Sequence, residues 1–420
     1  MPWRREPRVL ALVLAGGRGE RLRPLTDDRS KPAVPFGGKY RIIDFVLSSL
    51  VHSGITAIHV LTQYKAQSLL DHLQRAWIHS RTPEDFLTAV PAQMQAGKQW
   101  YRGTADAIYQ NLRLLDRTRP EMVAVFGADH VYKMNVRQMI DFHQSREAGV
   151  TVACMPVPKE DASAFGIIEV DEQWRICGFK EKPANPLTIP GQPGMCLASM
   201  GNYIFDRNMM VELLQEDAKN PDSEHDFGKS ILPKLVDTVP LYAYDFNRNE
   251  IPTEEDAESS YWRDIGTLDA YFEANLDLKN VQPRLNLYNA AWPIRTASYG
   301  EPPVKFVFDE DGRRGRAVQS ILTGGCIVAG GYVKDSVLGR NVTVDARSEI
   351  LECVIMDNVH VGADCRIRRT IIDKNNHIRD GSTIGYDLVE DAKKYTVSEG
   401  GVVVVARAKD SPENCAWNRI

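Results

Sequence analysis

The chain has 420 residues, of which 43% are hydrophobic and 25% charged, and its formal net charge at pH 7 is −5. This length favours two domains, and the ordinary composition excludes a disordered or fibrous chain. The mildly acidic, interspersed charge offers no basic surface for nucleic acid or anionic membrane, so neither is an expected partner. Seven cysteines without a C-x-x-C pair argue against a disulfide framework and a zinc site. No apolar run could span a membrane and no signal-peptide core follows the charged N-terminus, so the expected location is the cytoplasm.

Short β-branched runs alternate with helical patterns over roughly the first 270 residues. The predicted strands are Val9–Ala15, Ile58–Thr62, Met122–Phe126 and Val150–Met155. The predicted helices are Leu47–Ser53, Gln67–Trp77, Asp106–Leu115, Val136–Ala148 and, last, Tyr271–Leu278. Such alternation predicts an α/β domain with a mostly parallel, Rossmann-like sheet that carries helices on both faces.

A second pattern begins after the proline-rich loop at Glu301–Pro303, where an aliphatic residue returns at intervals of 6, 6 and 5. The predicted inward positions are Ile321, Ile327, Val333, Leu338, Val344, Ile350, Ile355, Val361, Ile367, Ile372, Ile378 and Ile384. No amphipathic helix keeps this spacing, whereas a left-handed parallel β-helix does, because each flat face of its coil points one aliphatic side chain inward. We therefore expect an α/β domain over residues 1–282, a linker over 283–317 and a β-helix domain over 318–420.

A glycine-rich turn follows the first strand directly, in the stretch LVLAGGRGERLRPLT. Its glycines and the basic residues in and after it are Gly16, Gly17, Gly19, Arg18, Arg21 and Lys31. Glycines let backbone N–H groups approach a polyphosphate closely, and the basic side chains supply the opposite charge. The turn is neither a Walker A loop nor a complete G-x-G-x-x-G, since Leu22 stands where the third glycine belongs. It indicates a phosphate site, and a tight turn with solvated arginines is the alternative.

Two carboxylates lie far apart in the sequence but are candidates for one site. Asp129 follows a hydrophobic strand in FGADHVYK, and Asp264 lies in YWRDIGT. Ligands of open α/β sheets bind at the carboxyl ends of the strands, where Asp129 falls. Two converging carboxylates suit Mg²⁺, which takes a few carboxylates together with substrate phosphates. For either aspartate alone, a turn or helix cap is the alternative.

The glycine turn followed by KPAV resembles the signature of the sugar-nucleotide pyrophosphorylases. Further stretches are similar to the members that use ATP and glucose 1-phosphate: FGGKYRIIDF, TQYKAQSL, WYRGTADAIYQN, EKPANP, ASMGNYIF, HDFGKSILP and YWRDIGT. The resemblance runs in order along nearly the whole chain. It implies a nucleotidyltransferase domain before the β-helix. It also implies the Mg²⁺-dependent reaction of ATP with α-D-glucose 1-phosphate, giving ADP-glucose for glycogen synthesis and pyrophosphate.

The resemblance also implies roles for particular residues. Catalytic roles fall on Arg21, Lys31, Asp129 and Asp264, of which the two aspartates would hold the metal. The ATP-binding residues would be Gly16, Gly17, Arg18, Gly19, Gln63 and Gly103. Glucose 1-phosphate would be bound by Tyr101, Gly166, Glu181, Lys182 and Ser199. Charge neutralisation and alignment do most of the work in such a transfer, so no enzyme nucleophile is expected.

Relatives of this build are homotetramers tuned by small effectors: sugar phosphates or pyruvate, and AMP, ADP or phosphate. Candidate effector-binding residues are Arg29, Arg41, Arg117 and Arg369, with Arg366 and Arg368 beside the last; ordinary surface charge is the alternative for each. Two positions depart from the relatives. Asp28 stands where some activated members carry lysine, and Glu20 where a small hydroxyl residue is common.

Three other functions remain open from the sequence. A dTDP- or UDP-sugar pyrophosphorylase would keep the fold and change the nucleotide. A catalytically silent regulatory subunit would bind substrates without turnover, although it could lose Lys31, Asp129, Lys182 and Asp264 freely. A hexapeptide acyltransferase could use His360 or His377 of the coil, but it would leave the patterned N-terminal part unexplained.

Overall fold

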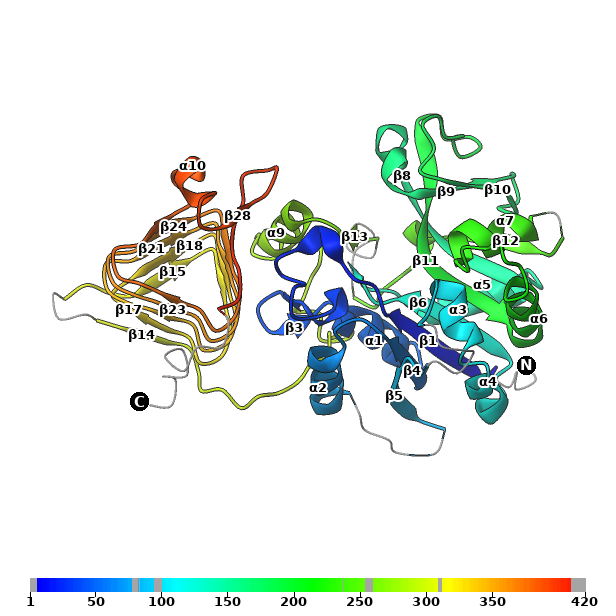
Figure 1. Ribbon diagram of the computed structural model, residues 1–420, viewed down its shortest axis with the longest axis horizontal. Helices are drawn as coiled ribbons and strands as arrows, with labels where there is room; N and C mark the ends of the chain where they lie inside the picture. Colours follow the sequence, from blue (N-terminus) through cyan, green and yellow to red (C-terminus); the bar gives the residue numbers. More distant parts are fainter. Residues whose placement is uncertain are drawn as a thin grey trace.

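The computed structural model describes residues 6–77, 82, 84–93, 100–236, 238–253, 260–308 and 312–408. Within these ranges, a nine-stranded sheet with helices stands beside a triangular coil of short strands (Figure 1). The predicted α/β domain followed by a parallel β-helix is therefore confirmed. Among the described residues, no helix combines the length and apolar character needed to cross a membrane.

The centre of the large sheet is parallel. β1 (Val9–Ala15) lies between β6 (Met122–Gly127) and β4 (Ala57–Thr62), and β5 (Phe86–Pro91) extends the sheet beyond β4. On the far side of β6 the sheet continues, with antiparallel and parallel pairs, through β11 (Met195–Asp206), β9 (Gly166–Val170), β10 (Ile176–Glu181), β8 (Val150–Pro158) and β12 (Leu241–Asp245). The first three predicted strands thus form the parallel centre, and the fourth lies in the mixed part.

Helices cover both faces of this sheet because its central strand is apolar on both. Leu10 and Leu12 of β1 enter one core, and Ala11 and Val13 enter the other. The helices that pack on the first core are α3 (Thr104–Tyr109), α4 (Arg113–Thr118), α6 (Arg207–Asp217) and α7 (Leu232–Leu235). Those on the second are α1 (Ile43–His52), α2 (Gln67–Ala76) and α5 (Val136–Ser145).

One predicted helix is divided in the structure. The stretch Asp106–Leu115 was expected to be a single helix, and it forms the end of α3, a turn and the start of α4. In the turn, the backbone N–H of Asn111 donates to the carbonyl of Ile108, three residues back. The Asn111 side chain donates to the Ala107 carbonyl at 2.8 Å and to the Tyr101 hydroxyl at 2.9 Å, and these bonds stabilise the tighter geometry.

The β-helix consists of three sheets that form the sides of the triangle (Figure 1). The first contains β14 (Lys305–Val307), β17 (Ile327–Ala329), β20 (Thr343–Val344), β23 (His360–Val361) and β26 (His377–Ile378). The second contains β15 (Arg316–Val318), β18 (Tyr332–Lys334), β21 (Glu349–Leu351), β24 (Arg366–Arg368) and β27 (Thr383–Ile384). The third contains β16 (Ile321–Leu322), β19 (Val337–Leu338), β22 (Val354–Ile355), β25 (Thr370–Ile372), β29 (Val403–Val405) and β28 (Thr396–Val397). The short helix α10 (Leu388–Asp391) lies between β27 and β28. The predicted terminal strand corresponds to β29, and the expected domain's last residues, 409–420, lie outside the described ranges.

The inward positions were predicted correctly from Val333 onward and incorrectly before it. Leu322 and Val328 face the core, instead of the expected Ile321 and Ile327. The reason is that Leu322 pairs with Leu338, so the first turn of the coil spans 16 residues, one fewer than the later turns. A shift of one residue exchanges the inner and outer faces of a strand. Ile321 accordingly packs outside the coil, against the N-terminal domain.

The two domains share a buried interface. Outward residues of the third sheet, Val354, Ile371 and Val404, belong to one apolar cluster with Phe36 and Tyr271 of the N-terminal domain. Tyr271 lies on α9 (Leu268–Asp277), the last helix of that domain. Strand pairing of the coil begins at Lys305, inside the segment expected to be linker. The start of that segment packs on the N-terminal domain, where the Arg295 N–H donates to Ser48 Oγ at 2.9 Å and the Thr296 hydroxyl to Asp44 at 2.7 Å.

Candidate functional site

A cleft of about 950 Å³ opens at the carboxyl ends of β1, β4 and β6. Ligands of open α/β sheets bind at this edge. Fourteen of the residues that the sequence assigned to substrates or metal line it: Gly16, Gly17, Arg18, Gly19, Arg21, Lys31, Gln63, Tyr101, Gly103, Asp129, Gly166, Glu181, Ser199 and Asp264. Lys182 is not among the lining residues, and its side chain is exposed. The cleft therefore gathers residues from the whole length of the N-terminal domain.

The glycine turn needs a glycine at position 19. Gly19 has φ +62°, and a Cβ added to it would lie 2.9 Å from Cβ of Lys31. Its carbonyl also accepts a hydrogen bond from the Thr26 hydroxyl at 2.9 Å, which closes the turn. An L-residue would be strained there both by its conformation and by the contact. The absence of a side chain is thus what lets the aliphatic stem of Lys31 pack directly on the turn.

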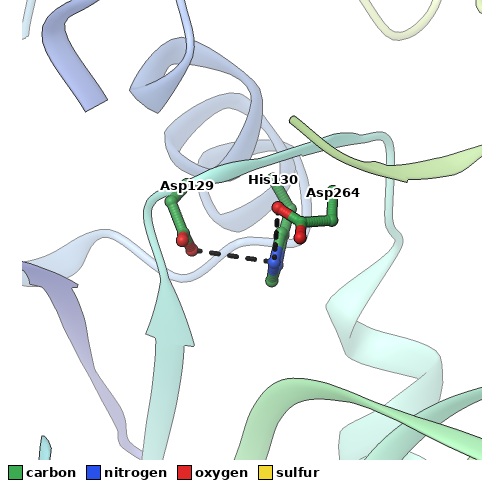
Figure 2. Close-up of side chains that lie close together, drawn as sticks. All are labelled: Asp129, His130 and Asp264. Atoms are coloured by element: carbon green, nitrogen blue, oxygen red, sulfur yellow. Dashed lines mark ion pairs between the residues drawn. The ribbon is translucent and has the colours of Figure 1, made fainter. Parts of the chain in front are cut away.

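Lys31, Asp129 and Asp264 form the polar centre of the cleft. Lys31 Nζ lies 3.2 Å from Asp129 Oδ2 and 3.0 Å from Asp264 Oδ1. Arg21 lies at the edge of the group, with a guanidinium nitrogen 3.9 Å from Asp264 Oδ2. Figure 2 shows the two carboxylates on either side of the His130 ring, whose Nε2 is 3.8 Å from Asp129 Oδ1 and 3.7 Å from Asp264 Oδ1. Strand pairing sets this arrangement, since β7 (His130–Tyr132) pairs with β13 (Trp262–Asp264) in a register that places His130 opposite Asp264.

The electrostatics keep these carboxylates ionised. Burial acts to raise the pKa of Asp129, but the charges of His130 and Lys31 outweigh it and hold that pKa well below its usual range. Ligand atoms of Asp129, His130 and Asp264 all lie within 4.8 Å of one another. Oxygen donors at this spacing fit a hard divalent cation such as Mg²⁺.

The histidine fits a hydrogen-bond donor better than a metal ligand. Its Nδ1 atom is buried and has no hydrogen-bond partner among the described residues. A ligating histidine usually donates its second N–H to a neighbour, so this environment suits a ring that carries its proton on Nε2, facing the carboxylates. Trp262 fixes the ring from the side, with the two ring centroids 5.1 Å apart.

Other residues of the cleft were not assigned from the sequence. They include His130, Thr104, Asp226, Tyr203, Trp262 and Gly266. The Thr104 hydroxyl donates to Asp226 Oδ2 at 2.9 Å, which ties the start of α3 to the HDFG segment. The available signal was that His130, Asp226 and Trp262 all stand inside quoted motifs, directly beside assigned residues or glycines.

Gln63 and Tyr101 hold each other on the side expected to receive the base. The Tyr101 N–H donates to Gln63 Oε1 at 3.0 Å, and Gln63 Nε2 lies 3.5 Å from the Tyr101 carbonyl. The Gln63 amide therefore braces the loop before α3. Gly103, two residues on, has no room for a Cβ, which would lie 2.3 Å from the carbonyl oxygen of His225.

Glu181 reaches the cleft from the end of β10, opposite Gly166 of β9. A Cβ on Gly166 would lie 2.8 Å from the ring of Phe179 and 3.0 Å from Glu181 Oε2, so the glycine keeps this wall open. Lys182 follows with φ +47°, and its N–H donates to the Phe165 carbonyl at 3.0 Å. The backbone thus turns at Lys182, immediately beside a carboxylate that lines the cleft.

The candidate effector arginines lie in different places. Arg29 and Arg41 are buried at the domain junction, where Arg29 pairs with Asp373 and Arg41 lies 3.7 Å from Asp357. Lys374 belongs to the same group, because burial together with the charges of Arg41 and Arg29 lowers the pKa of Lys374 to about 7. The junction therefore holds three basic side chains close together.

The other two arginines lie outside this group. Arg117 is exposed on α4, and its charge adds to burial in lowering the pKa of His59 to about 4. Arg369 lines a second groove, between α9 and the β-helix, where it donates to the Gly400 carbonyl at 3.2 Å.

Comparison with known proteins supports both halves of the chain. Residues 10–281 match the family model described as nucleotidyl transferase, and residues 302–405 match GlmU-like, C-terminal hexapeptide. A glucose-1-phosphate adenylyltransferase of Deinococcus radiodurans is 50% identical over 409 residues, covering 96% of this chain and 99% of its own. The enzyme of that name from Thermus thermophilus is 54% identical over 406 residues, covering 95% and 98%. A third, from an Anaeromyxobacter species, is 49% identical over 404 residues, covering 96% and 98%.

Proposed function

The chain belongs to the glucose-1-phosphate adenylyltransferases, and we propose that its cleft joins ATP and α-D-glucose 1-phosphate into ADP-glucose and pyrophosphate. The observation that carries this proposal is the convergence of the glycine turn, the two aspartates and Glu181 on one cleft. ADP-glucose is a glucosyl donor, so the reaction would supply glycogen synthesis. Both substrates are metabolites of the cytoplasm, where we expect the reaction to take place.

The triphosphate is expected to lie along the glycine turn. Gly17 faces open space, with no atom within 4 Å of a Cβ built on it, so its backbone is accessible from the cleft. Arg18 and Arg21 line the same side and are exposed, so both can turn toward phosphate oxygens. In this arrangement Arg21 and Lys31 would stabilise the charge that develops on the departing pyrophosphate.

Asp129 and Asp264 would hold Mg²⁺. When bound, the metal neutralises phosphate charge and polarises the α-phosphate for attack. The aspartates come from β7's leading edge and from β13, two strands fixed to each other by pairing, so their spacing is set before any ligand arrives. His130 would donate its Nε2–H to the carboxylates and keep them oriented.

Glucose 1-phosphate is expected on the opposite wall. Glu181 can accept hydrogen bonds from sugar hydroxyls, and Ser199 and the Tyr101 hydroxyl supply further polar contacts. The Lys182 side chain would have to turn inward to bind the sugar phosphate as a point charge. A phosphate oxygen of the sugar could then attack the α-phosphorus in line with the leaving pyrophosphate, without a covalent enzyme intermediate.

Arg29, Arg41 and Lys374 form the proposed effector site. Three basic side chains buried beside two aspartates would gain stabilisation from a phosphate or carboxylate effector that neutralises them. The site lies between domains, so an anion there would act on both. Arg117 and Arg369, which lie elsewhere, are weaker candidates for the same role.

A homotetramer is proposed on the family's pattern and on an exposed sheet end. The first turn of the β-helix leaves β14, β15 and β16 as edge strands. Phe306, Phe308 and Val318 are 49%, 62% and 44% exposed beside these edges. Unpaired strand edges next to apolar side chains are templates for association with another chain.

The decisive test is pyrophosphate release from glucose 1-phosphate and Mg²⁺ with ATP, UTP, dTTP or GTP. A strong preference for ATP would support the proposal, and stimulation by fructose 6-phosphate, fructose 1,6-bisphosphate or pyruvate would support the effector site. A preference for UTP or dTTP would keep the chemistry and change the substrate. No release with any nucleotide, under conditions in which a family member is active, would favour a silent subunit.

A further inference from the structure

The position between the two carboxylates of the cleft is taken by a side chain of the protein itself. Lys31 Nζ contacts Asp264 Oδ1 at 3.0 Å and Asp129 Oδ2 at 3.2 Å, and only 7% of the Lys31 side chain is exposed. The carboxylates are 27% and 46% exposed, on the open side of the cleft. The ammonium therefore bridges the same two groups that a divalent cation would bridge.

Two features hold Lys31 in this place. Its Cβ packs against the glycine turn, where a Cβ on Gly19 would lie 2.9 Å away, so the base of the side chain is fixed. Carboxylates that approach each other this closely repel unless a positive charge lies between them, and the Lys31 ammonium supplies it. Movement of Lys31 is thus confined to the end of its chain, between the carboxylates and the neighbouring turn.

We propose that Lys31 is an internal counter-ion that a divalent metal must displace, so that the metal binds tightly only together with a polyphosphate that accepts the displaced ammonium. The inference rests on the proposed metal role of Asp129 and Asp264. Metal binding alone would leave a buried ammonium without its carboxylates, which is unfavourable. When a triphosphate lies along the glycine turn, the same ammonium finds phosphate oxygens within reach of its flexible end. Metal and nucleotide therefore enter as a pair, and free metal is excluded.

The test is Mn²⁺ binding to the full chain without nucleotide, followed by the electron paramagnetic resonance signal of free Mn²⁺. Lys31→Met removes the charge and keeps the length of the side chain. It is expected to bind Mn²⁺ about tenfold more tightly than the unmodified chain, or more, since one charge close to a site is worth a factor of this order. Lys31→Gln, which keeps an N–H donor for the carboxylates, repeats the measurement if Lys31→Met does not fold. Lys180→Met is the matched control, because Lys180 pairs with Glu169, away from the two aspartates, and its Mn²⁺ affinity should equal that of the unmodified chain.

The same titration with α,β-methylene-ATP separates this inference from the proposed function. With the analogue, the advantage of Lys31→Met should disappear or reverse, because Lys31 then pairs with the triphosphate. Equal Mn²⁺ affinities of the unmodified chain and Lys31→Met without nucleotide would overturn the counter-ion role and leave the metal site intact. If Mn²⁺ binds neither chain even with the analogue, or if Asp129→Asn binds it as well as the unmodified chain, the assignment of the metal site is wrong and the inference falls with it.

Discussion

Arg29 and Asp373 form an ion pair across the domain junction, and only 2% and 1% of their side chains are exposed. Arg29 belongs to the segment that follows the glycine turn, and Asp373 directly follows β25 of the β-helix. Lys31 stands two residues after Arg29 and contacts the carboxylates of the cleft. One residue, Ser30, therefore separates a contact with the β-helix from a contact in the proposed active site.

Breaking this ion pair should destabilise the whole chain. Arg29→Gln leaves Asp373 buried without its partner, which we expect to lower the free energy of unfolding by about 3–5 kcal/mol. Asp373→Asn should have a similar effect, and the double variant should recover much of the loss, because no unpaired charge then remains. Chemical denaturation of the four chains measures the coupling. Lys393→Gln, in the exposed pair with Glu390, is the control and should cost no more than about 0.5 kcal/mol. Additive losses in the double variant would mean that the two side chains act independently.

Asp129→Asn should retain the fold and lose turnover. The carbonyl and amide of asparagine can remain beside Lys31, but the charge that would hold the metal is gone, so kcat should fall by about a thousandfold. Steady-state pyrophosphate release measures the effect, and thermal unfolding checks the fold. Glu20→Gln removes a carboxylate from the rim of the same cleft, where Glu20 pairs with the exposed Arg18, and is expected to change kcat by less than about threefold. A near-normal kcat for Asp129→Asn would remove this residue from the mechanism.

Lys182→Gln and Glu181→Gln should separate the two substrates. Both residues lie at the end of β10, on the wall assigned to the sugar, so each substitution should raise KM for glucose 1-phosphate by about tenfold or more. KM for ATP should stay within about threefold of normal, since the glycine turn is untouched. Initial rates with one substrate saturating and the other varied give both values. Lys180→Gln, two residues earlier and paired with Glu169, should change neither. Equal increases of both KM values would refute the assignment of this wall.

Anion binding at the domain junction should weaken as the pH rises above about 7. Burial and the charges of Arg41 and Arg29 lower the pKa of Lys374 to about 7, so above that pH the lysine is largely neutral. A bound anion favours the charged form and raises that pKa again, so binding takes up a proton and is tightest below about pH 7. Sulfate, which does not titrate in this range, isolates the effect of the protein.

Isothermal titration calorimetry with sulfate between about pH 6.5 and about pH 9 measures this dependence. The affinity should fall by up to about tenfold per pH unit over the upper part of the range. In Lys374→Met the affinity should be weaker at low pH and nearly independent of pH. An unmodified chain whose sulfate affinity does not change with pH would show that Lys374 does not contact the anion.

Much of this architecture could be predicted from local patterns. The apolar runs of β1, β4 and β6 and the recurring aliphatic residues of the coil are properties of short segments, and the structure has them at the expected places. The residues at the strand ends were also found, because glycines and aspartates directly after a buried strand face the ligand edge of a sheet. Fourteen substrate and metal candidates lie around one cleft for this reason.

What could not be predicted depends on pairing between distant segments. The shorter first turn of the coil follows from the pairing of Leu322 with Leu338, and nothing in the aliphatic spacing shows it. His130 was missed because its orientation is set by strand β13, more than 130 residues later. The pair between Arg29 and Asp373 joins residues 344 positions apart, so composition and motifs give no sign of it.

The apolar cluster at the junction makes the two domains parts of a single inherited unit. Leu22 and Leu25, just after the glycine turn, pack in the same cluster as Val354, Ile371 and Val404 of the β-helix. A chimera that fuses the first 300 residues to a foreign solenoid would leave that side of the turn without its packing partners unless the solenoid reproduced this face. Replacement domains for engineering therefore have to be chosen by the side chains of one sheet, and exchange of whole domains between distant relatives is expected to succeed only where that sheet has changed little.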